Sequence, residues 1–210
     1  GDSNVGGDFG VFLKWAEIDQ VVIRGRSASP CFLVIKKNGC LFEDAADLWG
    51  RDVGETEEIL RQRYGSSKRS STLTIGPGGE NRVRFASIHS GAHAAGRTGL
   101  GAVMGDKGVK SIVVQGGVPR FDELGLDKGF MKRLDSLVKN DPSYEGAKQY
   151  GATTAIEGFN KIGVLEVKNL QTGVWDQHEK ISGKYLRDTF TVRHYGCIFC
   201  NIQCKGISRF

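Results

Sequence analysis

The sequence CFLVIKKNGCLFED, residues 31–44, contains two apolar runs joined by Asn38 and Gly39. An Asn-Gly pair between two such runs predicts a β-hairpin, because a type I′ turn needs positive φ at both central residues. Cys31 and Cys40 are expected to face each other across this hairpin as small hydrophobic residues. The stretch therefore indicates a β-sheet in the first half of the chain.

Further strands are predicted on both sides of the hairpin, because short apolar runs alternate with turn-forming residues. They cover 21–27, 71–76, 82–90 and 111–116, with a turn in PGGEN, residues 77–81. Near-helical apolar spacing predicts an amphipathic helix over 8–19. A second helix is predicted over 55–65, with acidic residues in its first turn and Gly65 as its stop.

The character of the sequence changes near Val118, where strand signals fade. The later segments 121–140, 150–163 and 181–190 have helical or irregular patterns. The predicted fold class is α+β, with a β-sheet domain over 1–117 and the start of a helical domain over 118–210. A chain of 210 residues is long enough to bury a core without disulfides.

Composition argues against several classes of protein. The net charge is +5, but Lys and Arg alternate with Asp and Glu, so a nucleic-acid partner is not expected. The apolar runs are too short to cross a membrane, and no signal peptide opens the chain. An odd number of cysteines, five, with three close together, argues against a disulfide framework and favours a reducing cytoplasm.

Glycine is about twice as frequent as the usual ~7%, with 30 residues that fall within motifs. In SNVGGDFG, residues 3–10, adjacent glycines precede a predicted helix and suit either an anion site or a plain tight turn. In HAAGRTGLGAVMGDKG, residues 93–108, glycines surround Arg97, at a spacing that fits neither a dinucleotide fingerprint nor a P-loop. This second motif indicates either a phosphate-binding loop or a helix packed through small residues.

Three cysteines lie at spacing C-x2-C-x3-C in HYGCIFCNIQCKG, residues 194–206. They are Cys197, Cys200 and Cys204. Such a triad can hold three corners of a [4Fe–4S] cluster, with the fourth ligand supplied from elsewhere, Cys31 and Cys40 included. His194 offers the alternative of a closed Cys3His zinc site. Iron–sulfur is favoured, because structural zinc ligands usually come as two pairs separated by a loop.

Six stretches together, in this order and spacing, resemble the aldehyde ferredoxin oxidoreductase family of tungsten enzymes. They are SNVGGDFG, EDAADLWGRD with ETEE, IGPGGENRVRFASI, AAGRTGLGAVMGDKGVKSIVV, YGATTAIEGFNKIG with VKNLQTGV, and CIFCNIQC. The resemblance covers nearly the whole chain. It implies a β-sheet base domain for tungsten, or molybdenum, held by two pterins, with helical domains that cover this base.

The resemblance also implies roles for single residues. Asn4 and Ala94 match positions whose backbone carbonyls bind the magnesium that bridges two pterin phosphates, and magnesium prefers such hard oxygen ligands. His93 stands where the family usually has a phosphate-binding arginine. The matched pterin-binding positions are Gly6, Gly96 and Arg97.

The cysteine triad matches three ligands of the family's [4Fe–4S] cluster. The fourth cysteine and the catalytic residues are expected beyond Phe210, so these 210 residues alone are expected to be inactive. The implied activity is oxidation of a small aldehyde to a carboxylic acid, with electrons passed through the cluster to ferredoxin. A homo-oligomer is compatible with this assignment. The alternative is a non-catalytic iron–sulfur or zinc-binding module.

Overall fold

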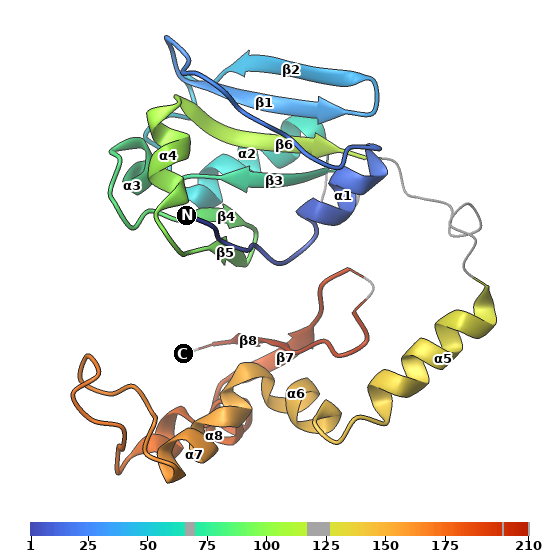
Figure 1. The fold of residues 1–210 in the computed structure, drawn as a ribbon, viewed down its shortest axis with the longest axis vertical. Coiled ribbons are helices and arrows are strands. Elements are labelled where there is room, and N and C mark those ends of the chain that lie inside the picture. Colours follow the sequence, from blue (N-terminus) through green and yellow to red (C-terminus); the bar gives the residue numbers. More distant parts are fainter. Residues whose placement is uncertain (66–69, 117–126, 199, 210) are drawn as a thin grey trace. The chain divides into compact units, whose positions relative to one another are not determined.

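The computed structural model describes residues 1–65, 70–116, 127–198 and 200–209. It forms two compact units, which are unit 1 (Gly1–Arg120) and unit 2 (Phe121–Phe210). Figure 1 shows both units, and each is described by itself. The predicted domain boundary at 117–118 lies outside the described residues.

Unit 1 is built on a six-stranded mixed sheet with strand order β2-β1-β6-β3-β4-β5 (Figure 1). Its strands are β1 (Cys31–Lys36), β2 (Gly39–Asp44), β3 (Ser70–Thr74), β4 (Ile88–Ser90), β5 (His93–Ala95) and β6 (Val109–Gln115). β1 and β6 run parallel, whereas the other neighbouring pairs are antiparallel. This sheet, together with helices, confirms the α+β prediction.

Helices cover both faces of the sheet near β1 and β6. The helix α1 (Phe9–Trp15) packs through Phe12 on the face that carries Leu33 and Ile35. The helix α2 (Val53–Tyr64) packs through Leu60 on the other face. Side chains of a strand alternate between faces, so coverage on both sides explains why β1 is a continuous apolar run.

The predicted helix over 55–65 is confirmed as α2, together with its end signals. The Asp52 side chain accepts a hydrogen bond from the Glu55 N–H at 2.8 Å, which caps the helix. Gly65 ends it with φ +98°, a conformation that glycine adopts without steric cost. The glycine stop was therefore predicted, whereas the Asp52 cap was not, and the helix begins two residues before the predicted start.

The hairpin of β1 and β2 is confirmed, but its turn and its cysteine pairing differ from the prediction. Lys36 pairs with Gly39, so the two turn residues are Lys37 and Asn38. Neither has positive φ, which falls instead on Gly39 at +138°, so the turn is not type I′. In this register Cys31 pairs with Asp44, and Cys40 pairs with Ile35, so the two cysteines do not face each other.

The strand predicted over 21–27 is wrong. The segment carries no ladder, and Gly25 has φ +71° in its middle. Val21 and Val22 are 37% and 63% exposed, so these apolar side chains are not packed in the core. Two contacts to Lys107 hold the segment, and they do not form a sheet ladder.

The region 77–90 also differs from the prediction. PGGE forms a short helix, α3 (Pro77–Glu80), where a turn was expected, with Pro77 at a position that favours helix starts. The predicted strand over 82–90 is restricted to β4, Ile88–Ser90. Phe85 is 81% exposed. The Ala86 carbonyl accepts a hydrogen bond at 2.9 Å from the N–H of Gly101, in the helix α4 (Leu100–Asp106). The backbone at Ala86 therefore bonds to a helix and not to a neighbouring strand.

Unit 2 combines short helices with one hairpin. Its elements are α5 (Lys128–Lys139), α6 (Tyr144–Tyr150), η2 (Gly151–Ala155), α7 (Ile156–Lys161), η3 (His178–Ile181), α8 (Gly183–Thr189), β7 (Thr191–Tyr195) and β8 (Lys205–Ser208). β7 and β8 pair antiparallel and were not predicted. In the part of the chain that the structure describes, no helix combines the length and the apolarity needed to cross a bilayer.

Candidate cofactor-binding site

The two glycine motifs, far apart in the sequence, meet in unit 1. The Arg97 N–H donates to Ser3 Oγ at 3.1 Å, and Thr98 Oγ1 donates to the Asp2 carbonyl at 3.2 Å. These bonds join the segment before α1 to the loop between β5 and α4. Sequence reasoning singled out both motifs but missed Ser3 and Thr98 as the residues that connect them.

His93 explains the glycine pair of the first motif. A Cβ atom at Gly6 would lie 2.5 Å from His93 Nδ1, and one at Gly7 would lie 2.8 Å from Cδ2 of the same ring. Gly7 also has φ +87°, which glycine adopts without steric cost. The imidazole therefore packs directly on this backbone, and a larger residue at either position would displace it.

Gly96 and Arg97 border open space at the junction. No heavy atom lies within 4 Å of a Cβ placed on Gly96, and Arg97 is exposed. An open glycine backbone beside a guanidinium suits a phosphate, because the guanidinium can donate a forked pair of hydrogen bonds. Asn4 and Ala94 are exposed at the same junction, and backbone carbonyls are oxygen ligands of the kind that magnesium accepts.

The remainder of the second motif serves helix packing. Gly99 starts α4 with φ +69°, and a Cβ atom there would lie 1.9 Å from the Arg84 carbonyl oxygen. A Cβ atom at Gly105 would lie 2.0 Å from the Gly79 carbonyl oxygen. Close packing therefore explains Gly99 and Gly105, whereas Gly96 faces open space and phosphate binding there stays a prediction.

The cysteine triad lies on the connection between β7 and β8. The Cys200 N–H donates to the Cys197 carbonyl at 3.0 Å, which forms a turn, and none of the three cysteines is in a disulfide. Cys197 and Cys200 are half-buried, and Cys204 is exposed directly before β8. Within the described ranges, no three His, Cys, Asp or Glu side chains are arranged to hold a metal ion, so the thiols share one loop without converging.

His194, the alternative zinc ligand, lies in β7 and lines a cavity of unit 2 together with Cys204. This cavity has a volume of about 230 Å³ and also borders Gly183, Arg187 and Gly206. The hairpin brings one histidine and one cysteine of the motif to a common surface. Soft thiolate donors fit an iron–sulfur cluster in kind, and the same donors with an imidazole fit zinc.

Comparison with known proteins places this pair of units in one family. The family model described as aldehyde ferredoxin oxidoreductase, N-terminal domain, matches residues 1–116. The model described as aldehyde ferredoxin oxidoreductase, domains 2 and 3, matches residues 130–210. The chain belongs to the aldehyde ferredoxin oxidoreductase family.

Individual relatives agree with this assignment. The tungsten-containing aldehyde ferredoxin oxidoreductases of Pyrococcus furiosus and Thermococcus kodakarensis are 38% and 36% identical over 99% of this chain. The solved BamBC complex of benzoyl coenzyme A reductase, with bound 1,5-dienoyl-CoA, aligns with a TM-score of 0.73 and 28% identity over 99% of the chain. The chain spans about a third of the length of these proteins, 34% in each case.

Proposed function

We propose that this chain contributes the phosphate-anchoring base and part of the iron–sulfur site of a tungsten or molybdenum bis-pterin oxidoreductase. The observation that carries the proposal is the junction of the 1–7 and 93–98 segments in a chain of this family. There, Gly96 borders open space beside the exposed Arg97. A phosphate group at this surface could contact both the open backbone of Gly96 and the guanidinium of Arg97.

This chain contains proposed ligands for the pterin phosphates and for the magnesium ion. Arg97 and the backbone at Gly6 and Gly96 would bind pterin phosphate, with His93 beside them where the family usually has arginine. The carbonyls of Asn4 and Ala94 would bind magnesium. When bound, the metal–pterin group supplies two-electron redox chemistry, and the protein supplies orientation and a tuned environment.

The triad would hold three corners of a [4Fe–4S] cluster as thiolates. Three cysteines outside disulfides on one short loop between two strands support this assignment, since thiolates are the usual ligands of such clusters. The reaction we infer converts an aldehyde and water to a carboxylic acid, two protons and two electrons. The electrons leave through the cluster to ferredoxin, which balances the reaction.

We further infer a cytoplasmic location, because a reducing compartment is consistent with five cysteines that form no disulfide. Self-association into a homo-oligomer is compatible with this function. Relatives include a protein of Pyrococcus furiosus named aliphatic sulfonate oxidoreductase, WOR-like subunit, which is 29% identical over 96% of the chain. The substrate class is therefore the part of the proposal that an assay has to establish.

The test uses full-length protein purified without oxygen. Elemental and pterin analysis should find tungsten or molybdenum with pterin and iron, and a small aldehyde should reduce benzyl viologen. Zinc without pterin would support the non-catalytic module instead. Pterin and metal with no aldehyde-dependent reduction, but with turnover of another substrate class, would retain the cofactor assignment and reject the substrate.

A further inference from the structure

Unit 1 contains a cavity that is lined by none of the residues assigned to the cofactor. It has a volume of about 290 Å³, near the lower end of the ~300–1,000 Å³ usual for ligand pockets. One wall is the segment 23–27, which was expected to be a strand. Lys107 holds this wall, because its carbonyl accepts from Ser27 N–H at 2.9 Å and its Nζ donates to the Gly25 carbonyl at 3.1 Å.

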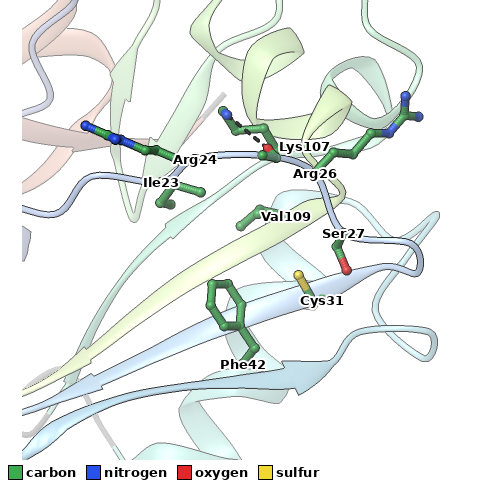
Figure 2. A pocket seen from close by; sticks show the side chains of 9 residues that line it. Ile23, Arg24, Arg26, Ser27, Cys31, Phe42, Lys107 and Val109 are labelled. Carbon is green, nitrogen blue, oxygen red and sulfur yellow. Dashed lines mark hydrogen bonds between the residues drawn. The ribbon is translucent and has the colours of Figure 1, made fainter.

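The cavity has an apolar floor and a basic rim. Figure 2 shows the floor side chains pointing toward one another, whereas the two arginines extend outward at opposite ends. The apolar floor consists of Ile23, Phe42 and Val109. The basic rim consists of Arg24, Arg26 and Lys107.

Among the described residues, no carboxylate lines the cavity, and the charged side chains that line it are all basic. Asp106 lies 3.7 Å from Arg26 but also 3.5 Å from Arg82, so it is shared between two guanidiniums. Asp44, the ladder partner of Cys31, accepts the Ala46 N–H at 2.8 Å. The rim therefore retains an excess of positive charge that an anion can offset.

The Cys31 thiol adds a buried polar group that opens into this cavity. Cys31 is 7% exposed, and its sulfur points into the space between the floor and the 23–27 wall (Figure 2). Cys31 forms no disulfide, and a thiol can donate one weak hydrogen bond. A ligand with an acceptor oxygen would satisfy this thiol and the rim together.

We propose that this cavity binds a small organic anion, with its acidic group at the basic rim and its apolar body on the apolar floor. The apolar floor excludes a purely inorganic anion as the best occupant, because such an ion would leave the floor side chains uncovered. The basic rim excludes a neutral apolar molecule, because arginine prefers a carboxylate or phosphate. This inference is independent of the proposed redox function.

Cys31 provides a local readout, and Cys40 provides its control. Both belong to one hairpin, but Cys40 is exposed and lies outside the cavity lining. Full-length protein is treated with methyl methanethiosulfonate, and modification of each cysteine is followed by peptide mass spectrometry. Phenylacetate should slow modification of Cys31 several-fold at saturation and leave Cys40 unchanged.

Two further probes separate charge from apolar contact. Phenylacetamide, the neutral analogue, should not protect Cys31, and inorganic phosphate should protect it less than phenylacetate does. Equal protection by phenylacetamide would overturn the role of the basic rim. Equal protection by phosphate would overturn the role of the apolar floor, and no protection by phenylacetate would overturn the site.

Exposed residues allow matched variants that should leave the core intact. The double variant Arg24→Gln and Arg26→Gln should weaken phenylacetate binding at least tenfold by calorimetry, because the rim loses two of its three positive charges. Arg61→Gln, on the far helix α2, should leave binding unchanged. Phe42→Ala should weaken phenylacetate more than phosphate. Equal affinity in the double variant and in Arg61→Gln would contradict the proposal.

Discussion

Lys110 and Glu80 form an ion pair inside unit 1, where their side chains are 0% and 4% exposed. Lys110 Nζ also donates to the Arg51 carbonyl at 2.7 Å, and Glu80 Oε2 accepts the Gly50 N–H at 2.8 Å. The network ties β6 to α3 and to the loop that precedes α2. Buried charges are tolerated here because both are paired and hydrogen-bonded.

Lys110→Met should destabilise unit 1 by roughly 3–5 kcal/mol, because the Glu80 carboxylate would remain buried without its counter-charge. Urea denaturation measures this loss. The double variant Lys110→Met and Glu80→Gln should recover part of it. Lys14→Met, which removes a solvent-exposed ion pair with Asp19, is the control and should change stability little. A loss no larger than that of the control would contradict the prediction.

Gly105→Ala should separate α4 from α3, because its methyl group would lie 2.0 Å from the Gly79 carbonyl oxygen. Overpacking of this kind costs about 1–3 kcal/mol or more, which thermal denaturation would detect. Gly78→Ala is the matched control, since no heavy atom lies within 4 Å of its added Cβ. Similar melting temperatures for the two variants would show that this contact can relax without cost.

Arg97→Ala should lower the pterin content of purified full-length protein. Charged hydrogen bonds contribute ~1.5–3 kcal/mol, so retention should fall by about tenfold or more. Arg97→Lys should recover only part of it, because an ammonium keeps the charge but loses the fork. Arg84→Ala changes an exposed arginine outside the junction and should retain the pterin. Unchanged pterin in Arg97→Ala would argue against a phosphate contact.

Cys200→Ser should abolish the [4Fe–4S] cluster, because a hydroxyl is a poor substitute for a thiolate ligand. Anaerobic iron and sulfide analysis with visible spectroscopy would measure the loss. Cys40→Ser, in the exposed strand β2, should keep the iron content of the unmodified protein. Stoichiometric zinc and no iron in the unmodified protein would reject the cluster and support a Cys3His site with His194.

Tyr64 should make stability fall at alkaline pH. Burial, together with a 2.6 Å hydrogen bond from its hydroxyl to Glu43, raises the pKa of Tyr64 above its ordinary value. The unfolded chain releases this proton near pH ~10, so the contribution is present below that pH and is lost as pH rises. Urea midpoints should therefore fall less steeply above this pH in Tyr64→Phe. Tyr185→Phe is the control, and identical slopes in both variants would contradict the assignment.

Local patterns predicted the elements whose signals lie within a few residues. The hairpin of β1 and β2 follows from two apolar runs with Asn38–Gly39 between them, and α2 follows from its acidic first turn and its glycine stop. The segment 21–27 has strand-forming residues but forms no ladder within the described residues, where Lys107 bonds to Gly25 and Ser27. β-Propensity describes a fit to a sheet, so it fails where no neighbour is present.

The sequence predicted the separate motifs of the candidate site but not the hydrogen bonds that join them. Arg97 and the glycines around it were recognisable as a motif, and the resemblance implied roles for them that stay predictions. The bonds from Arg97 to Ser3 and from Thr98 to Asp2 join residues more than ninety positions apart, which no local period encodes. β7 and β8 were missed because each is short and the cysteine loop separates them.

The position of β1 between β2 and β6 has a consequence for synthesis on the ribosome. β2 follows β1 after two residues, so this hairpin can close within microseconds of emergence. β6, which pairs with the other edge of β1, begins only at Val109. At typical elongation rates, on the order of 4–15 s pass between synthesis of the hairpin and synthesis of β6, which pairs with the other edge of β1. During that interval the apolar strand β1 has unpaired backbone groups along one edge, so we expect that shielding this edge during synthesis reduces aggregation.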